Sequence, residues 1–281
     1  MSSYSYVDGK YCLKSTAKTF INDRGYQFGD AIYEVILYRE GTFFDLNGHL
    51  TRLRNSLRSL DIDLKISNNS LLIIIKHLIR INKIKIASIY IQVSRGVYER
   101  DHSYINMKMK PVLVVTTKKI KNNFEVNIKG VKVITLNETR WSYPNIKTVQ
   151  LLPNVLAKTE ANKNDAYEAI FVDKEGYITE GSSSNIWILN KDNKLYTRDL
   201  DGSILPGITR NTVLNCANKN KFSILEKKFK IQDMLSAKEV FVTSASSFVT
   251  PVIKVNETLI NNGVVGEFSY ELRKLYLDLY N

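Results

Sequence analysis

Apolar residues with two different spacings alternate along the chain, and this alternation constrains the fold more than any other feature. Four leucines between residues 49 and 60 recur at helical spacing and predict a helix there, and residues 69–83 predict a second helix. Runs rich in β-branched residues at 88–94 and 111–117 predict strands. A hairpin is expected from residues 33 to 45, because a turn at Arg39-Glu-Gly41 separates two strand-like segments.

A second set of elements follows residues 118–124, where lysine and asparagine concentrate. The elements expected there are strands at 124–136, 167–172, 177–179, 185–189 and 240–244 and helices at 148–164, 207–218 and 266–279. Pro153 is expected to interrupt or start the first of these helices. Helices and strands are therefore mixed in both halves, which indicates an α/β (α+β) fold. Since 281 residues exceed one modest core, we expect two domains, residues 1–120 and residues 121–281.

The composition is that of a globular protein, with 44% hydrophobic and 24% charged residues. Two cysteines and three dispersed histidines offer no zinc-binding pattern, so no metal site is expected. The longest apolar run, residues 71–75, is too short to cross a membrane, and the first residues lack the pattern of a secretory leader. We therefore expect a cytoplasmic protein with no membrane partner.

The net charge of +12 is compatible with a nucleic-acid partner. However, the lysines are scattered, and the sequence has no aromatic RNA-binding motif or helix-turn-helix. We interpret the charge as a solvated basic surface that favours anionic substrates or cofactors, and we expect no nucleic-acid partner.

Three polar segments are candidates for holding an anion. In residues 204–210, Gly207 precedes Ile208 and Thr209 at a predicted helix start, where backbone N–H groups can face a phosphate; the alternative is a plain helix cap. The hydroxyl clusters at 182–184 and 243–247 fit either an anion site or polar turns.

Two further candidates carry charge. Lys147 follows an aromatic and apolar stretch, as a Schiff-base lysine requires, although a lone lysine in this lysine-rich chain is weak evidence. Arg100 and His102 are two residues apart and would point the same way from an extended strand, which suits capture of a carboxylate. A charged surface loop is the alternative.

Together these segments resemble the fold-type IV aminotransferases, which use pyridoxal 5'-phosphate. Residues 24–34 read RGYQFGDAIYE and match the RGxxFGDGxYE block of that family, and residues 49–53 match its HxxRL block. Residues 146–158 match the segment with the catalytic lysine, and residues 167–185 match the segment with the cofactor-ring carboxylate. The phosphate-binding segments match at 207–210 and 242–244. The resemblance covers nearly the whole chain and implies a larger C-terminal domain with a barrel-like β core.

The resemblance also implies residue roles. Lys147 would bind the cofactor covalently and move the substrate proton, and Glu180 would pair with the ring nitrogen. The other implied cofactor contacts are Arg52, Ser183, Leu205, Ile208, Thr209 and Ser244. Tyr33, Arg100 and His102 match positions that hold the substrate carboxylate in the D-amino-acid enzymes of the family. There the segment near Arg100 serves the neighbouring subunit, so a homodimer is expected.

These matches favour transamination between D-amino acids and 2-oxo acids, such as D-alanine and 2-oxoglutarate. The alternatives within the family are a branched-chain L-amino-acid aminotransferase and a 4-amino-4-deoxychorismate lyase. Two positions depart from the pattern: Ala31 replaces a glycine of the first block, and Ala245 stands where threonine is common. The second departure implies a shifted or missing hydroxyl near the phosphate.

Overall fold

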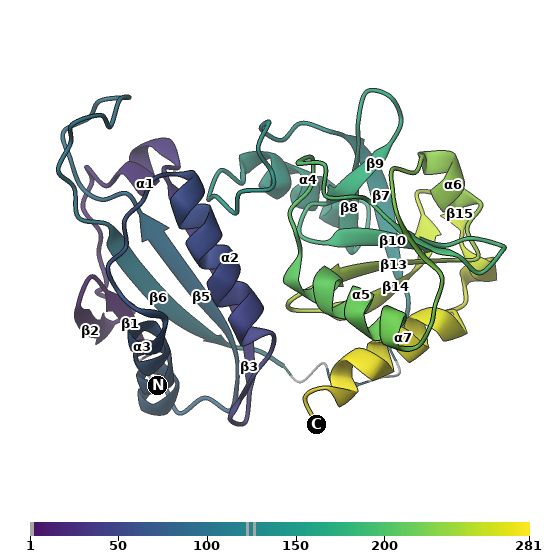
Figure 1. Cartoon of the computed structure of the whole chain (residues 1–281), viewed down its shortest axis with the longest axis horizontal. Helices are drawn as coiled ribbons and strands as arrows, with labels where there is room; N and C mark the ends of the chain where they lie inside the picture. Colours follow the sequence, from purple (N-terminus) through teal and green to yellow (C-terminus); the bar gives the residue numbers. More distant parts are fainter. Residues whose placement is uncertain (1–2, 122–123, 126–127) are drawn as a thin grey trace. The chain divides into compact units, whose positions relative to one another are not determined.

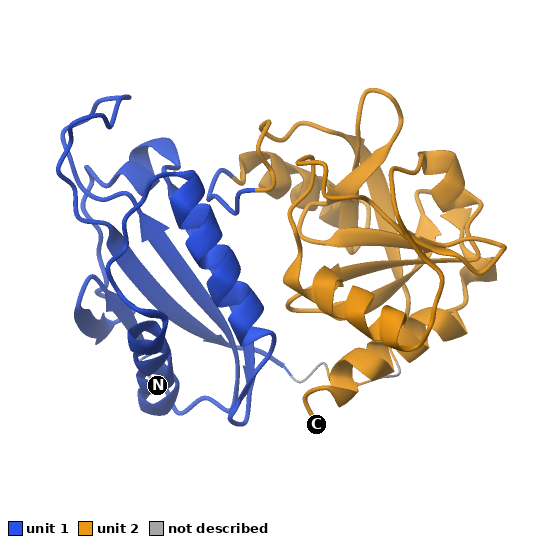
Figure 2. Ribbon diagram, in the orientation of Figure 1, with its two compact units in different colours: residues 1–122, 146–150 blue, residues 123–145, 151–281 orange. Residues whose placement is uncertain are grey.

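The computed structural model describes residues 3–121, 124–125 and 128–281, which form two compact units (Figure 2). Unit 1 comprises residues 1–122 with 146–150, and unit 2 comprises residues 123–145 with 151–281. Each unit combines helices with a β-sheet, so the predicted α/β fold is confirmed.

Unit 1 is built on an antiparallel sheet with the strand order β2-β1-β6-β5-β3-β4 among the described residues (Figure 1). Its strands are β1 (Tyr4–Val7), β2 (Lys10–Leu13), β3 (Ala31–Arg39), β4 (Thr42–Phe43), β5 (Ile86–Ser94) and β6 (Val112–Lys119). Its helices are α1 (Arg24–Phe28), α2 (Leu46–Ser59) and α3 (Asn68–Ile81). The predicted hairpin is confirmed as β3 and β4, and Gly41 at its turn has φ 104°.

The core of unit 1 lies between the sheet and the helices α2 and α3. The predicted leucine and isoleucine stripes of both helices are buried in it, including Leu53 and Ile75, which are 0% exposed. Ser67 caps α3, because its hydroxyl accepts a hydrogen bond from the Ser70 N–H at 3.1 Å. The helices predicted at 49–60 and 69–83 are therefore confirmed, with ends that differ by a few residues.

Unit 2 contains a larger sheet that curls around its own apolar core (Figure 1). Among the described residues its strands are β7 (Val131–Asn137), β8 (Glu168–Val172), β9 (Ile178–Gly181), β10 (Asn185–Leu189), β11 (Leu195–Thr197), β12 (Ile224–Glu226), β13 (Glu239–Ser244), β14 (Phe248–Val255) and β15 (Thr258–Leu259). The helices are α4 (Leu152–Lys163), α5 (Ile208–Lys219), α6 (Ile231–Leu235), α7 (Glu267–Asp278) and the 3-10 turn η1 (Asn261–Gly263). The strand expected at 124–136 begins only at Val131, and part of that range, residues 126–127, lies outside the described residues.

Strand β14 was not predicted, although it lies inside the sheet of unit 2. It pairs antiparallel with β13 and parallel with β7. Pro251 stands in the middle of β14, and a proline normally argues against an internal strand because it cannot donate to the ladder. The pairing with β7 shifts register between Val252 and Lys254, close to this proline. The missing N–H of Pro251 is therefore accommodated by a local irregularity in the strand pairing.

The segment around Lys147 differs from the prediction in its placement. Residues 146–150 were expected in the C-terminal domain but belong to unit 1. The helix expected at 148–164 begins at Leu152, next to Pro153, which was expected to interrupt or start it. The N–H of Tyr33 donates to the carbonyl of Lys147 at 3.0 Å, and the N–H of Val149 donates to Ala31 at 3.1 Å. Residues 147–149 are therefore extended along β3, and Pro153 stands in the first turn of the helix that follows.

A charged cluster is buried in unit 1. Glu34 lies on the core face of β3 between Ile32 and Ile36, and its side chain is 1% exposed. Its carboxylate accepts hydrogen bonds from Arg52 Nε at 2.7 Å and Nη2 at 2.9 Å, and it lies 2.8 Å from His49 Nδ1. Burial alone would raise the pKa of Glu34, but the Arg52 charge and the hydrogen bonds from both partners lower it to about 2.

We predict that Glu34→Gln lowers the free energy of unfolding by about 3 kcal/mol near neutral pH, because the buried guanidinium then faces a neutral amide. The folded pKa lies below the ordinary value of 4.5, so the carboxylate stabilises the fold above that value and loses this effect as the pH falls toward 2. The stability difference between the two proteins should therefore shrink in acid, as measured by chemical denaturation. Glu271→Gln, at an exposed position of α7, is the matched control. Equal stability of wild type and Glu34→Gln at neutral pH would contradict this account.

Candidate active site

Lys147 and Tyr33 meet on unit 1. The Lys147 amine lies 3.3 Å from the Tyr33 hydroxyl and 4.3 Å from the centre of the Tyr33 ring. The backbone N–H of Lys147 faces the Ser56 hydroxyl of α2 at 3.4 Å. Lys147 forms no ion pair within the described residues, and its amine contacts a hydroxyl and an aromatic face. Such an amine is suited to act as a nucleophile or a proton carrier.

Tyr33 is itself supported by the face of the sheet opposite the core. Its ring stacks on Tyr90 of β5, with centres 5.6 Å apart, and the Tyr90 hydroxyl donates to Gln92 at 2.7 Å. Burial raises the pKa of Tyr90 to about 12, and the neighbouring Tyr33 adds to this effect. Tyr90 therefore stays a neutral hydroxyl and contributes no charge beside the amine.

Arg52 is held in unit 1 by the Glu34 pair described above. Its side chain is 9% exposed and comes from α2, where the HxxRL block places His49 and Arg52 three residues apart on one helix face. The block therefore brings both side chains to one buried carboxylate, Glu34, which the sequence interpretation did not single out.

Arg100 and His102 are not brought to Tyr33 within the described residues. Both are exposed and pack on Phe28, with the Arg100 guanidinium 5.0 Å and the His102 ring 5.3 Å from the centre of its ring. Their loop is fixed by Arg24, which donates to the carbonyl oxygens of Asp101 at 2.5 Å and His102 at 3.1 Å. The predicted carboxylate-binding residues thus form two groups on unit 1, one at Tyr33 and one at Phe28.

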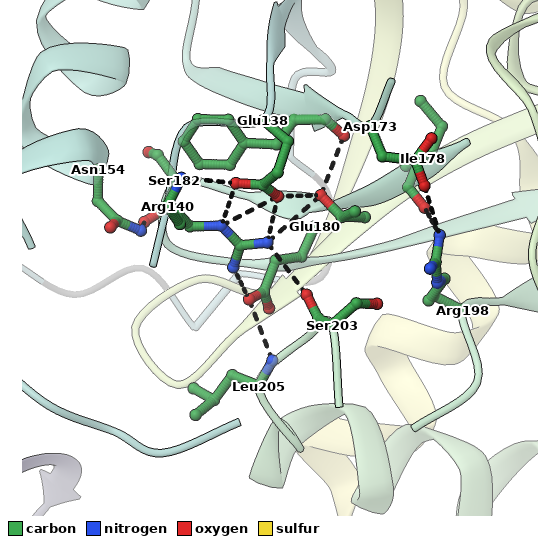
Figure 3. Close-up of polar contacts among 12 residues, drawn as sticks. Glu138, Arg140, Asn154, Asp173, Ile178, Glu180, Ser182, Arg198, Ser203 and Leu205 are labelled. Atoms are coloured by element: carbon green, nitrogen blue, oxygen red, sulfur yellow. Dashed lines mark hydrogen bonds and ion pairs between the residues drawn. The ribbon is translucent and has the colours of Figure 1, made fainter. Parts of the chain in front are cut away.

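In unit 2, Glu180 is buried among hydrogen-bond donors. It accepts from the backbone N–H of Leu205 at 3.0 Å and from Arg140 in a very short contact (Figure 3). It also accepts from the Asn185 amide at 3.1 Å. Its side chain is 7% exposed. A buried carboxylate held in place by several donors can face a cation, such as a protonated ring nitrogen. Leu205, predicted to touch the cofactor ring, lies directly beside it.

The start of α5 has the features of a phosphate site. Gly207 is the N-cap and supplies no side-chain hydrogen bond to the helix. The Thr209 residue is 3% exposed, yet its buried hydroxyl has no hydrogen-bond partner among the described residues. A side chain at Gly207 would collide with the Asn185 amide oxygen, so glycine is required there. Ile208 and Thr209 therefore begin a helix whose first N–H groups and one hydroxyl suit an oxyanion.

The three serines at 182–184 serve a second carboxylate. Ser182, Ser183 and Ser184 all donate side-chain hydrogen bonds to Glu168, which is 0% exposed. For Ser183 the hydroxyl distance is 2.7 Å, and its backbone N–H also faces Glu168 at 3.2 Å. The hydroxyl hydrogen of Ser183 is therefore used inside the chain, and its oxygen can only accept a bond from a ligand.

Ser244 ends β13 beside other hydroxyls. Its oxygen lies 2.7 Å from that of Ser247 and 3.5 Å from that of Ser246. Ala245, the departure noted in the sequence, is followed directly by these two serines. The local supply of hydroxyls therefore does not depend on a threonine at 245.

Besides Glu34 in unit 1, sequence reasoning missed three charged residues of the clusters in unit 2: Glu138, Arg140 and Glu168. Glu138 and Arg140 follow β7, and Arg140 donates to both Glu138 and Glu180 (Figure 3). Glu168 begins β8 in a strongly apolar strand, and a charge in such a strand is the one signal that points to a buried partner. Glu138 and Arg140 carry no such signal, because they lie in a polar stretch.

Comparison with known proteins gives the same family as the sequence motifs. The profile of the amino-transferase class IV family matches residues 31–255. The D-alanine aminotransferase of Staphylococcus aureus (strain N315) is 38% identical over 269 residues, covering 96% of this chain and 95% of that protein. The D-alanine aminotransferase of Bacillus licheniformis is 37% identical over 259 residues, covering 92% and 90%.

Solved structures of branched-chain amino acid aminotransferases share the fold. The Escherichia coli protein superposes with a TM-score of 0.89 at 20% identity, covering 100% of this chain and 95% of that one. Another such enzyme, solved with pyridoxamine 5'-phosphate, gives 0.88 at 24%, covering 99% and 94%. The fold-type IV resemblance, including the barrel-like core of unit 2, is thereby confirmed. Because profile and relatives extend over most of its length, the chain belongs to the class IV aminotransferases.

Proposed function

We propose that this chain catalyses transamination between D-amino acids and 2-oxo acids, with D-alanine and 2-oxoglutarate as a substrate pair. The observation that carries the proposal is the identity of 38% over nearly the full length with a D-alanine aminotransferase. The branched-chain structures are less than 25% identical and support the fold alone. The branched-chain and lyase alternatives are therefore left to the assay below.

Class IV aminotransferases are pyridoxal-phosphate enzymes, and the residues of this chain fit that cofactor. When bound, pyridoxal phosphate supplies an aldehyde that condenses with amines and a ring that withdraws electrons from the substrate Cα. The Thr209 hydroxyl, which has no partner in the described part of the chain, suits the phosphate at the glycine-capped start of α5. Arg52, Ile208 and Ser244 are the other proposed phosphate contacts, with Ser183 and Leu205 near the ring.

The proposed chemistry assigns one task to each charged residue. The Lys147 amine holds the cofactor and then carries the proton that leaves the substrate Cα, while the Tyr33 hydroxyl at 3.3 Å steadies the amine. Glu180 stays anionic and favours a proton on the ring nitrogen. Arg100 and His102 bind the substrate carboxylate with Tyr33, which leaves the Cα hydrogen of a D-amino acid toward Lys147.

We also propose a homodimer in which the Arg100 loop serves the partner subunit. In support, the segments 20–26 and 97–105 are linked by backbone pairing, such as the bridge between Asp23 and Val97. They expose large apolar side chains: Phe20 (71%), Ile21 (80%), Tyr26 (76%) and Ile105 (73%). Such a patch is typical of a surface that is covered in an assembly. The cytoplasmic location remains a prediction, and none of the described helices has the length and hydropathy to span a bilayer.

A chiral assay tests the function directly. We expect the purified protein with pyridoxal phosphate and 2-oxoglutarate to consume D-alanine and to produce D-glutamate, resolved by chiral chromatography. L-leucine and L-alanine should react far more slowly, because the carboxylate anchor directs the Cα hydrogen of the L-enantiomer away from Lys147. Faster turnover of L-leucine would favour the branched-chain alternative and overturn the proposal.

The role of Lys147 is tested by its removal. Lys147→Ala should abolish transamination, because no other amine is expected to carry the substrate proton, while the phosphate contacts still allow cofactor to bind. Borohydride should fix the cofactor irreversibly to a peptide containing residue 147 in wild type, as read by mass spectrometry. Lys158→Ala, a neighbouring lysine at a half-exposed position of α4, should keep both the activity and the label. Labelling elsewhere in wild type would contradict the assignment.

Mixed dimers test the shared site. Arg100→Ala should weaken D-alanine binding by about 2 kcal/mol, because it removes charge-assisted hydrogen bonds. If Arg100 serves the partner subunit, a dimer of Lys147→Ala with Arg100→Ala chains retains one complete site. Random mixing should then restore roughly a quarter of wild-type activity, since half the dimers are mixed and each has one intact site of two. No gain over the separate variants would rule out sharing of the site between subunits.

A further inference from the structure

Arg140 is bound by two carboxylates at once (Figure 3). Its Nε donates to both oxygens of Glu138, at 2.9 Å and 3.2 Å, and its Nη2 donates to Glu138 at 2.5 Å. Its Nη1 makes the very short contact with Glu180. The guanidinium therefore holds Glu138 with one edge and Glu180 with a single nitrogen, so the two ion pairs differ in geometry.

Other groups fix this arrangement on the Glu138 side. The Thr179 hydroxyl donates to Glu138 at 2.7 Å, and Arg140 Nη2 also donates to the Ser203 carbonyl at 3.2 Å. The guanidinium lies 5.1 Å from the centre of the Phe171 ring. Arg140 is thus anchored mainly by groups other than Glu180, and it presents one N–H to that carboxylate from a fixed position.

The charges in this cluster do not cancel. Glu138 and Glu180 are acidic and Arg140 is basic, so the formal sum is −1. The side chains are 21%, 7% and 5% exposed in that order, so water screens their interactions weakly. Burial opposes charge on Glu138 and Arg140. Hydrogen bonds and opposite charges within the cluster, including the charge of Glu180, outweigh burial, so the pKa of Glu138 is lowered and that of Arg140 is raised.

A guanidinium beside Glu180 has two opposing effects. It keeps Glu180 ionised and oriented, but alone it would also offset the negative charge that Glu180 offers to a cation. Glu138 removes this conflict, because its charge balances that of Arg140. The triad therefore combines a rigid hold on Glu180 with a net charge of −1.

We propose that Glu138 and Arg140 are positioning residues that act through Glu180: Arg140 holds the carboxylate, and Glu138 offsets the Arg140 charge so that Glu180 still stabilises a protonated cofactor ring. This inference rests on the proposed function, in which Glu180 faces the ring nitrogen. A purely structural triad would lose function when either supporting residue is replaced. The inference instead predicts that replacing Glu138 weakens the stabilisation of the protonated ring, whereas replacing Arg140 does not.

The test compares two ligands of the apoprotein: pyridoxal phosphate and its 1-deaza analogue, in which a C–H replaces the ring nitrogen. Both keep the aldehyde and the phosphate, so the ratio of their dissociation constants isolates the interaction at the ring nitrogen. Glu138→Gln should reduce the preference for pyridoxal phosphate by on the order of tenfold, because the triad then sums to zero. Arg140→Gln, measured near pH 8 to keep both carboxylates ionised, should leave the preference at least as large as in wild type.

The double variant Glu138→Gln/Arg140→Gln decides between charge and structure. Its charge equals that of wild type, so the preference should return to near the wild-type value even though the hold on Glu180 is lost. Glu175→Gln, an exposed carboxylate of the same unit, makes the same change in net charge and should have no effect. Circular dichroism of each variant checks that it folds. If Arg140→Gln unfolds, Arg140→Lys replaces it in the test. This variant keeps the positive charge but loses the paired guanidinium donors, and it should retain the preference for pyridoxal phosphate.

Both single variants could lose the preference for pyridoxal phosphate, and the double variant could lose more of it. That result would overturn the inference and would mean that the triad has a structural role only. Equal affinity of wild type for the two ligands would also overturn it, and would place the fault in the assignment of Glu180. The chiral assay is independent of these affinities, so a protein that transaminates D-alanine but fails here keeps its proposed function.

Discussion

The main chain of residues 147–149 runs along the first residues of β3, and the reactive part of unit 1 depends on this pairing. The hydrogen bond from Tyr33 N–H to the Lys147 carbonyl places the two residues side by side. The Lys147 amine can therefore reach the Tyr33 hydroxyl while the backbone is already fixed. A lysine on a free loop would also lose backbone entropy on reaching such a position. The pairing is made by backbone atoms, so it does not depend on which side chains flank the lysine.

The buried carboxylates of the two units differ in how far nearby cations compensate their charge. In unit 1, the negative charge of the buried Glu34 is compensated by Arg52, and His49 also contacts the carboxylate. In unit 2, Glu138 and Glu180 both pair with Arg140, and the formal charges of these three residues sum to −1. A buried excess charge costs free energy unless a ligand compensates for it, so its presence indicates a place built for a cation rather than for stability alone.

Much of this architecture is readable from the sequence, and the failures have physical reasons. Helical leucine spacing identified α2 and α3, because their stripes are buried against a sheet. Strand β14 escaped, since Pro251 violates the rule for internal strands and only the neighbouring strands reveal how it is tolerated. The motif matches led to Lys147, Glu180 and Thr209. Arg140 and Glu138 could not be identified from the sequence. A polar stretch after a strand has the same residue pattern whether its side chains contact water or a buried carboxylate.

The division of the chain between the units has a consequence for its synthesis. Unit 1 takes residues 146–150 from beyond a segment that belongs to unit 2, so the early part of β3 lacks the neighbour formed by residues 147–149 until that segment has been translated. A nascent chain released after residue 122 would hold the apolar core of unit 1 but expose an unpaired strand edge. Because unpaired edges favour association with other chains, this strand edge is open to such association until residue 149 has emerged.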